Sequence, residues 1–415
     1  MMTYDVVVLG AGMVGVSSAV HLQRRGLSVA LVDRRGPGLE TSYGNAGIIQ
    51  REAVRPYAFP RAWSDLVGIA SNRRLDVRYH PGALPRFAVP LWRYFRASAP
   101  ASYEPIARDY ASLIALSIET HAELARDAAA QSLLDKRGFL MILRTERARD
   151  LAFAEAQQVH QAHGVAHRLL DGAALAAIEP GIVGAHAGAV HWTDPWTVRN
   201  PGALVQAYAR LFEAEGGAFF QGDADSLSRV AGAWRLDTAA HGAIGARRVV
   251  LALGPWTPRV TARFGYRPPL FVKRGYHMHY SALPGRALEH WLFDAERGYL
   301  LAPMQQGIRL TTGAELGSIE HPSTPVQLER AEQVAREIFP LGERCEDTPW
   351  RGARPCMPDM KPVIGAVPGT TDLWCAFGHG HQGFTLGPAT GQLLAAMMSG
   401  AAPAIPMHPF RPDRF

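Results

Sequence analysis

A glycine-rich turn between two short apolar runs constrains this chain of 415 residues more than any other feature. Residues 4–9 read YDVVVL and are followed by GAGMVG, a helix-like segment at 16–25, a stop at Gly26 and a second apolar run at 28–32. These pieces in this order predict a strand–helix–strand unit. We therefore expect an α/β chain that begins with a parallel, Rossmann-like sheet.

The three glycines of this turn have separate tasks in binding a dinucleotide. Gly10 permits the tight turn after the strand, Gly12 lets the backbone approach a pyrophosphate, and Gly15 lets the helix pack closely on the sheet. The phosphates would lie at the helix N-terminus, where free N–H groups and the helix dipole favour negative charge. Asp33 ends the second run and is placed to accept hydrogen bonds from ribose hydroxyls. The pattern predicts a dinucleotide site rather than an unliganded glycine turn.

The residues after Asp33 favour FAD over NAD. An NAD enzyme would usually continue with further alternating strands and helices. Here a basic, glycine-rich loop follows instead, RRGPGLETS at 34–42, which suits an adenosine phosphate and a flavin edge. Apolar runs at 248–253 and 373–377 and a helix-like segment at 386–398 predict that the chain returns to this domain at its middle and its end.

The segments between these runs differ in character. They contain aromatic strand candidates at 276–280, 299–302 and 308–312, and an alanine-rich helix candidate at 112–130. We expect a Rossmann-like FAD-binding domain interleaved with an α+β substrate-binding domain that contains a large antiparallel sheet. The FAD-binding domain would comprise residues 1–50, 196–260 and 351–415, and the substrate-binding domain residues 51–195 and 261–350.

Charge and composition narrow the class of protein. Lysine and arginine exceed aspartate and glutamate by 43 to 37, and this mild excess suits an anionic substrate, an anionic dinucleotide or an acidic membrane surface. The basic residues are scattered, which is not typical of a nucleic-acid binder. The three cysteines form no CxxC pair, no signal peptide is evident, and no apolar stretch reaches the roughly 18 residues that span a bilayer. We expect a cytoplasmic protein, either free or on the cytoplasmic face of the membrane.

Five motifs in order make the chain resemble the D-amino-acid oxidase-like (DAO) flavoproteins, which include D-amino-acid dehydrogenase, glycine oxidase and sarcosine oxidase. They are GAGMVG with Asp33, SYGNAG at 42–47, VVLALGPWT at 249–257, WRGARPCMPDMKPVIG at 350–365 and GHGHQGFTLGPATG at 378–391. The resemblance covers nearly the whole chain and implies an FAD-dependent oxidoreductase that acts on an amino acid.

The resemblance also implies a set of FAD-binding positions. Residues 44–47 would run beside the isoalloxazine ring, and the helix that begins near Gly383 would point its N-terminus at the pyrimidine end of the flavin. The full set comprises Gly10, Gly12, Met13, Gly15, Asp33, Arg34, Arg35, Thr41, Ser42, Asn45, Ala46, Gly47, Ile48, Gly254, Trp256, Gly378, His379, Gly383, Phe384 and Thr385.

Three positions carry the substrate chemistry that the resemblance implies. Arg354 falls at the arginine that grips the substrate carboxylate with two parallel hydrogen bonds, although a structural arginine before a proline is the alternative. Tyr299 falls at the tyrosine that closes the pocket, or is an ordinary strand aromatic. His381 replaces the second arginine of glycine oxidase-like relatives, and an imidazole does not guarantee a positive charge at neutral pH. It either bonds a polar group of the substrate or packs the loop.

The implied reaction is hydride transfer from the α-carbon of a small D-amino acid to flavin N5, which gives an imine and then a 2-oxo acid. A neutral or cyclic substrate such as D-proline or hydroxyproline is favoured, and no essential general base is expected. Three alternatives stay open: an oxygen-using glycine, sarcosine or D-amino-acid oxidase, the FAD subunit of a hetero-oligomeric dehydrogenase, and a flavin-binding module without catalysis. The electron acceptor is open between a quinone, a partner subunit and oxygen.

Other reactive residues receive simpler interpretations. Two H-x-H pairs, His277 with His279 and His379 with His381, lack an accompanying carboxylate motif, so we expect no metal site. Cys356 lies off the position at which some sarcosine oxidases attach flavin covalently, and we expect a small buried thiol. Residues 86–96 mix aromatics with arginines, which fits either a packed helix or a peripheral contact with a membrane or an electron acceptor.

Overall fold

A computed structural model describes the whole chain, residues 1–415, and its first sheet forms around the strand before the glycine turn. β1 (Thr3–Leu9) lies between β2 (Val29–Asp33) and β13 (Gly242–Leu251) and runs parallel to both. The valines of β1 are buried on both faces, as is typical of a parallel sheet. The order is β10-β2-β1-β13-β12-β11, with β22 beside β13 and β21 beside β22. The other strands are β10 (Ala218–Gln221), β11 (Ser228–Val230), β12 (Ala233–Thr238), β21 (Val363–Ala366) and β22 (Leu373–Phe377).

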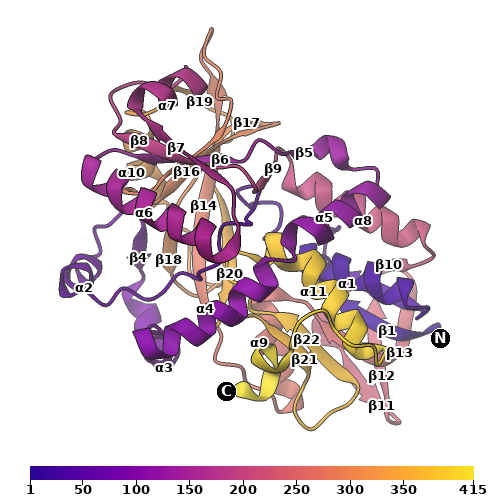
Figure 1. Cartoon of the computed structure of the whole chain (residues 1–415). Coiled ribbons are helices and arrows are strands. Elements are labelled where there is room, and N and C mark those ends of the chain that lie inside the picture. The colour runs from indigo at the N-terminus through magenta and orange to yellow at the C-terminus, as the bar shows by residue number, and fades with distance from the viewer.

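Two glycine-bearing helices pack face to face against this sheet. α1 (Met13–Arg24) begins directly after the glycine turn, and α11 (Gly383–Met398) lies against it (Figure 1). A Cβ atom at Gly391 would lie 2.6 Å from the backbone of Ser17, so the glycines of the 378–391 motif permit this close approach. α5 (Ser117–Asp127) and α8 (Pro201–Ala214) cover the same side.

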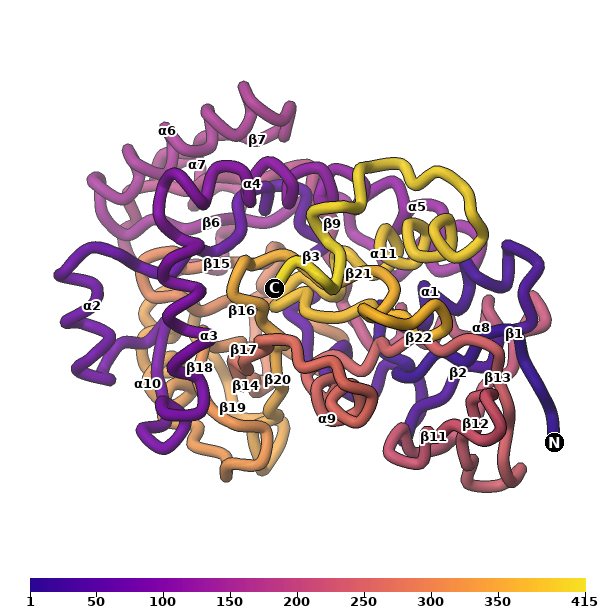
Figure 2. The backbone as a smooth tube through the Cα atoms, turned by 90° about the horizontal axis from the view of Figure 1, so that it is seen from below, coloured from indigo at the N-terminus to yellow at the C-terminus, as the bar shows by residue number.

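The second sheet has eleven strands and is mostly antiparallel. Its order is β4-β18-β14-β17-β16-β15-β6-β8-β7, and β19 and β20 also pair with β14. It lies at the opposite end of the molecule from the N-terminus (Figures 1 and 2). Its strands are β4 (Val77–Tyr79), β6 (Phe139–Leu143), β7 (His167–Asp171), β8 (Gly188–Trp192), β14 (Phe271–Ala282), β15 (Trp291–Asp294), β16 (Tyr299–Met304), β17 (Gly307–Thr311), β18 (Ala314–Leu316), β19 (Leu341–Arg344) and β20 (Trp350–Cys356).

The alternation of side chains along β14 divides a packed face from an open one. Tyr276, Met278 and Tyr280 join the apolar cluster that includes α10 (Val326–Ala335) and α7 (Gly172–Ile178). Phe271, Lys273 and Gly275 point to the other face, because successive strand residues alternate. That open face borders the cavity in which the predicted site residues meet.

A short third sheet joins the two large ones. It consists of β3 (Ile48–Ile49), β9 (Trp196–Val198) and β5 (Leu134–Asp135). The fold class expected from the sequence is confirmed. For the domain boundaries we propose the expected division with one adjustment: β20 hydrogen-bonds to β14, so the last boundary lies after Cys356 rather than at residue 351.

The remaining helices include one departure from expectation. The helix predicted over 112–130 is interrupted at 115–116, between α4 (Pro100–Ile114) and α5. Residues 86–96 lie within α3 (Leu84–Ala97), which packs through Phe87 and Tyr94. α2 (Trp63–Ala70), α6 (Glu146–His163) and α9 (Thr257–Thr261) complete the set. No helix combines the length and apolarity needed to cross a membrane, and the cytoplasmic location stays a prediction.

Candidate active site

One cavity of about 930 Å³ brings the two ends of the predicted site together. At one end it is lined by Gly10, Gly12 and Asp33 from the first sheet, and at the other by Lys273 and Arg354 from the second. This volume is at the upper end of the usual range for ligand sites, so it has room for a large cofactor and a small substrate. The predicted substrate residues Tyr299 and His381 line the same cavity.

The dinucleotide end is built as the glycine pattern predicts. Gly10 has a φ of 105°, a conformation that side-chain-bearing residues rarely adopt, and a Cβ there would lie 2.5 Å from the carbonyl oxygen of Ala252. Asp33 Oδ2 accepts from the N–H of Ala11 at 2.7 Å, and Oδ1 accepts from the N–H of Arg35 at 2.9 Å. Burial raises the pKa of this carboxyl. Asp33 lines the cavity, and each carboxylate oxygen keeps a lone pair that could accept from a ribose hydroxyl.

The loop after β2 closes this end of the cavity. Ser42 Oγ accepts from the N–H of Met13 at 3.0 Å and so caps α1. The Arg34 guanidinium lies 4.5 Å from the ring centre of Trp256 and pairs with Glu40 at 2.8 Å. Arg34, Glu40 and Trp256 line the cavity, and the basic loop and the second glycine motif therefore meet across it.

Four of the predicted cofactor residues do not line the cavity. A Cβ at Gly15 would lie 1.7 Å from the Gly10 carbonyl oxygen, which supports the packing task expected for it. Arg35 extends into solvent, and Gly47, with a φ of 73°, turns the chain against Val198. Thr385 Oγ1 accepts from the Gln50 N–H at 3.2 Å and ties α11 to the segment after β3. The others line the cavity: Gly10, Gly12, Met13, Asp33, Arg34, Thr41, Ser42, Asn45, Ala46, Ile48, Gly254, Trp256, Gly378, His379, Gly383 and Phe384.

A chain of hydrogen bonds through the buried Arg309 holds the loop of residues 43–47 in place. Arg309 Nη1 donates to the carbonyl oxygens of Asn45 at 2.7 Å and Tyr43 at 3.2 Å. Arg309 Nε donates to His279 Nε2 at 2.9 Å, and His279 Nδ1 contacts Glu346. Burial lowers the pKa of Arg309 to about 10. His279 of the first H-x-H pair therefore links Arg309 to Glu346.

Arg354 is a partly buried cation without an acidic partner in the protein. Its guanidinium donates only to two backbone carbonyls, Gly313 at 3.0 Å and Thr312 at 3.2 Å, and it forms no ion pair. Its pKa is lowered by burial, but an arginine keeps its charge at any ordinary pH. A Cβ at Gly275 would lie 2.7 Å from Arg354 Nη2, so this glycine gives the guanidinium its room. Charge and exposure to the cavity suit Arg354 to a carboxylate ligand.

Sequence reasoning missed a second cation, Lys273. It is the direct strand neighbour of Arg354 across the β14–β20 pair and lines the same cavity. Its ammonium lies 4.6 Å from the ring centre of Tyr94 and has no carboxylate partner. Burial acts to lower its pKa, but Tyr94 and Cys356 raise it above the ordinary value, so the group stays protonated. A lysine within the otherwise apolar or aromatic open face of a buried strand is the signal that could have found it.

Tyr299 contributes its ring rather than a free hydroxyl. It lines the cavity, but its hydroxyl accepts from Arg144 Nη2 at 3.3 Å. Arg144 also pairs with the buried Asp294 at 2.8 Å. The hydroxyl is thus already engaged on the far side of the side chain.

His381 lies beside Arg354 and is neutral. Burial, with the charges of Arg354 and Lys273, lowers its pKa to about 3. Its ring lies 5.0 Å from that of Tyr57, which also lines the cavity. Lys273, across the strand pair from Arg354, is the second cation of the cavity wall.

A polar chain that the sequence did not indicate runs along the wall from α11. Gln382 Nε2 donates to Gln50 Oε1 at 2.7 Å, and Gln50 Nε2 donates to Glu52 Oε1 at 2.7 Å. Gln50 and Glu52 line the cavity. Burial raises the pKa of Glu52 to about 7. No motif marks this glutamate, because its chemistry arises only from its enclosure.

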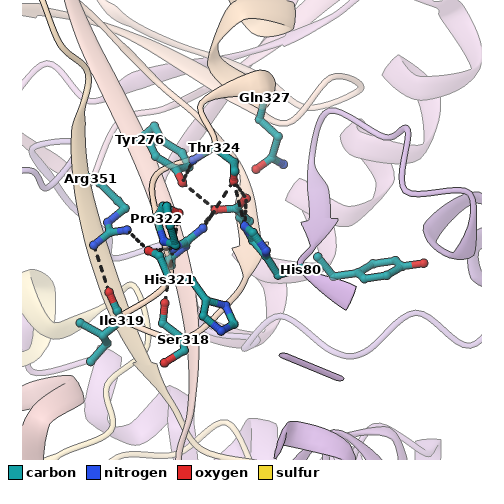
Figure 3. Close-up of polar contacts among 12 residues, drawn as sticks. His80, Tyr276, Ser318, Ile319, His321, Pro322, Thr324, Gln327 and Arg351 are labelled. Atoms are coloured by element: carbon teal, nitrogen blue, oxygen red, sulfur yellow. Dashed lines mark hydrogen bonds and ion pairs between the residues drawn. The ribbon is translucent and has the colours of Figure 1, made fainter. Parts of the chain in front are cut away.

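The opposite face of β14 carries a buried charge of a different kind. Arg274 pairs with Glu315 at 2.7 Å, and Tyr276 donates its hydroxyl to the same carboxylate at 2.7 Å. The backbone N–H of Thr324 donates to the Tyr276 hydroxyl at 3.0 Å, and Arg351 donates to the Ile319 carbonyl (Figure 3). This network joins the strands to the segment at 318–324, and only Tyr276 of its members also lines the cavity.

The structure holds no group of three or more metal-binding side chains. Cys356 lines the cavity opposite Phe271, and burial raises the pKa of its thiol, whereas Lys273 and Arg354 act to lower it. His379 Nε2 lies 2.9 Å from Thr390 Oγ1, and burial lowers its pKa to about 3. The second H-x-H pair thus consists of two neutral rings in the cavity wall.

The residues present fit FAD. The left-handed turn at Gly10, the side-chain-free Gly12, the ribose acceptor Asp33 and a cavity that continues from them to Arg354 are the features that a dinucleotide needs. Gly44 adds a further one, because a Cβ there would lie 1.9 Å from Trp350 and the loop at 43–47 could not lie flat against the cavity.

Comparisons with known proteins agree with this geometry. Residues 5–397 match the family model of FAD dependent oxidoreductases (DAO). A D-amino-acid oxidase of Bradyrhizobium diazoefficiens is 30% identical, over 99% of this chain and 98% of that protein. A D-amino acid dehydrogenase of Chromohalobacter salexigens is 28% identical, over 97% of each chain.

Solved structures share the fold at lower identity. Glycine oxidase from Geobacillus kaustophilus superposes with a TM-score of 0.75 at 22% identity, over 100% of both chains. L-proline dehydrogenase from P. horikoshii superposes with a TM-score of 0.74 at 18% identity, over 100% of this chain and 98% of that one. At these identities the likeness carries the fold alone.

Proposed function

This chain belongs to the family of FAD-dependent oxidoreductases, and from that premise we propose that it oxidises a small D-amino acid at the α-carbon. The product would be an imine, which water converts to a 2-oxo acid and ammonia unless the substrate is cyclic. The names of the curated relatives support this substrate class.

One observation carries the proposal: Arg354 is a charged, cavity-facing group that the protein leaves without a carboxylate. Burying a charge without a partner is costly, so a site that does so is suited to a ligand of opposite charge. The carbonyls of Thr312 and Gly313 hold the guanidinium plane in one orientation. A substrate carboxylate would complete the site with two parallel hydrogen bonds.

FAD, when bound, supplies the acceptor for the hydride that leaves the α-carbon. The task of the chain is to bind and orient. Arg354 would fix the carboxylate, Lys273 would add a second positive charge, and His381 and the Tyr299 ring would form the walls. Water exclusion by these walls strengthens each charged contact.

For the side chain of the substrate we propose a neutral or cyclic group. Aromatic side chains dominate this part of the cavity, and Tyr57, Tyr94 and Tyr110 all line it. Lys273 could instead favour an acidic side chain, and the screen below includes that case.

An anaerobic screen tests the proposal directly. The purified protein, loaded with FAD, is mixed with D-alanine, D-proline, D-glutamate, their L-enantiomers, glycine and sarcosine, and the flavin absorbance is followed. Bleaching by neutral or cyclic D-amino acids is expected. Bleaching only by L-amino acids, or faster bleaching by D-glutamate than by D-proline, would contradict the substrate class. A protein that binds no FAD would end the proposal.

The oxidase named among the relatives gives the second candidate. We propose a dehydrogenase, with a quinone or a partner protein rather than oxygen as the acceptor. Stoichiometric peroxide during aerobic turnover would favour the oxidase instead. Full activity of the lone chain with an artificial dye would count against the need for a second subunit.

For access to the electron acceptor, we propose that α3 makes a peripheral contact with an acidic membrane. Trp92 is 61% exposed and lies among the exposed Arg86, Arg93 and Arg96 of the same helix. Co-sedimentation with vesicles that contain phosphatidylglycerol should be lost in Trp92→Ser. No sedimentation of the unaltered protein would exclude the contact.

A further inference from the structure

Glu52 is a buried acid that no protein cation neutralises. It lies in the segment that leaves β3, and only 9% of it is exposed. Oε1 accepts from Gln50 Nε2 at 2.7 Å, whereas Oε2 has no hydrogen-bond partner. The nearest cation, Arg51, donates elsewhere, to the His163 carbonyl. A buried carboxyl oxygen without a partner in a ligand cavity calls for an explanation.

The position of Glu52 is fixed relative to the carboxylate site. Gln50 and Gln382 connect it to the start of α11, where Gln382 Nε2 also lies 3.0 Å from His381. Tyr57 lies near both charges. Partial burial and Glu52 raise the pKa of its hydroxyl, and Arg354 lowers it, although 62% of the residue is exposed. The cavity therefore holds an acid and a cation near Tyr57.

The groups around Glu52 do not supply a counter-charge. Tyr57 and Tyr110 of α4 face it, and burial raises the pKa of both hydroxyls, so they are neutral at physiological pH. Burial raises the pKa of Glu52, whereas the hydrogen bond from Gln50 and the charge of Arg51, on the same segment, lower it by less than burial raises it. A ligand cation would meet no competitor at Oε2.

We propose that Glu52 binds the amino group of the substrate and accepts the proton that its ammonium form must lose. This rests on the proposed function. With Arg354 on the carboxylate, the site then reads both charges of an amino-acid zwitterion. The N–H bond breaks and the proton moves to the Glu52 carboxylate. The freed nitrogen lone pair would form the C=N bond as the α-C–H bond breaks. The electron pair of the C–H bond would leave with the hydrogen as hydride, for which FAD, when bound, would supply the acceptor.

Two consequences follow. The site selects amines over 2-hydroxy acids, which carry no ammonium group for the acid to pair with. The expectation of no essential general base would also be revised, because a carboxyl whose burial raises its pKa to about 7 is poised to accept a proton near neutral pH.

Two ligands that the enzyme cannot oxidise allow binding to be measured separately from the redox reaction. 2-Aminoisobutyrate has both charges but no α-hydrogen, and isobutyrate lacks the amine. Their affinities for the FAD-loaded protein are measured by calorimetry at pH 8. In Glu52→Gln the affinity for 2-aminoisobutyrate should fall about 10- to 100-fold, as for a lost hydrogen bond between charged groups, and that for isobutyrate should stay within about twofold. Glu104→Gln, an exposed glutamate on α4, is the matched control and should change neither.

The unaltered protein provides a test that no folding defect can confuse. As the pH falls from 8 to 6, Glu52 takes up a proton and its attraction for an ammonium group is lost. The affinity for 2-aminoisobutyrate should therefore drop about tenfold, and that for isobutyrate should not. Parallel pH profiles for the two ligands would overturn the proposal.

Turnover separates this inference from the proposed function. In Glu52→Gln, kcat/KM for the best D-amino acid should fall about 100-fold at pH 7, with FAD still bound and with the acid limb of the profile lost. Unchanged rates and an unchanged pH profile would overturn the role of Glu52 and leave the proposed function intact. Failure of every amino acid to bleach the flavin of the unaltered protein would overturn the proposed function itself.

Discussion

Arg274 and Arg354 lie on neighbouring strands, one fully buried and the other partly buried, and differ in how the fold pairs their guanidinium groups. The Arg274 side chain is 1% exposed and its partner Glu315 is 0% exposed. Arg274 Nη1 donates in addition to the carbonyls of His321 and Pro322. Arg354 has only carbonyl partners and opens on the cavity.

This difference distinguishes charged residues that stabilise the fold through ion pairs from unpaired charged residues that could bind a ligand. An isolated buried charge is destabilising, so a buried charge with a purely structural role is expected to have a partner of opposite charge. Glu315 does so for Arg274, whereas Arg354, Lys273 and Glu52 have no ion-pair partner within the protein. All three unpaired groups line one cavity, and this concentration marks the functional site.

The largest expected effect is on stability and comes from breaking the ion pair between Arg274 and Glu315. Arg274→Met leaves the Glu315 carboxylate buried without its cation, and we expect a loss of about 3–5 kcal/mol in the free energy of unfolding. Urea unfolding followed by tryptophan fluorescence measures it. Arg235→Ala, which breaks an exposed pair with Asp237, is the control and should cost under about 1 kcal/mol. Equal losses of unfolding free energy in the two variants would contradict the structural role assigned to the buried Arg274–Glu315 pair.

On the unpaired side, Arg354→Ala should leave stability unchanged and impair catalysis. Losing one partner of a charged contact that excludes water weakens ligand binding by about 2–5 kcal/mol, so KM should rise by about 30-fold or more, up to a few thousand-fold. Arg354→Lys should recover only part of this, because an ammonium cannot make two parallel hydrogen bonds. FAD absorbance and the melting temperature are the controls. Loss of FAD in Arg354→Ala would show that the arginine serves the cofactor instead.

The pH dependence of stability sharpens the comparison for Glu52. Because burial raises its folded-state pKa above the ordinary value, to about 7, the folded protein holds this proton more tightly than the unfolded chain. Between about pH 4.5 and 7 the unfolded state therefore binds fewer protons, and stability falls as the pH rises. Glu52→Gln removes this dependence. The free energy of unfolding of the variant, relative to that of the unaltered protein, should therefore be higher at pH 8 than at pH 5, by up to about 3 kcal/mol. Urea midpoints at the two pH values test this, and a constant difference would contradict it.

The smallest expected effect belongs to Lys273. It has no acid to pair with, so Lys273→Met should keep the fold and the FAD. A single charged hydrogen bond contributes about 1.5–3 kcal/mol, and KM for a D-amino acid should rise about tenfold. A drop in the melting temperature larger than that of Arg354→Ala would indicate a structural lysine instead.

Much of the first sheet could be predicted because its signals are local. The strand at 4–9, the turn at Gly10 and the helix after it depend on backbone conformation and apolar period within thirty residues. The helix at 112–130 was expected in one piece, and its break at 115–116 shows the limit of such reasoning, since no proline or glycine announces it.

The active site divides in the same way. Arg354 could be placed because a motif surrounds it, and the structure puts it in the cavity with His381 and Tyr299. The pocket-closing role of Tyr299 stays a prediction, and the sequence does not indicate that Arg144, which follows β6, engages its hydroxyl. Lys273 and Glu52 carry no motif and were not found.

The sequence by itself determined where a dinucleotide could bind, because a left-handed turn, a bare backbone and a terminal acid are properties of neighbouring residues. Only the tertiary structure decided which charged groups are paired. Lys273 and Arg274 are adjacent in the chain, yet the pleat of β14 sends one to the cavity and the other to Glu315. Whether a buried charge meets an opposite one depends on segments far away in sequence, and that pairing distinguishes the charges that stabilise the fold from those left free for a substrate.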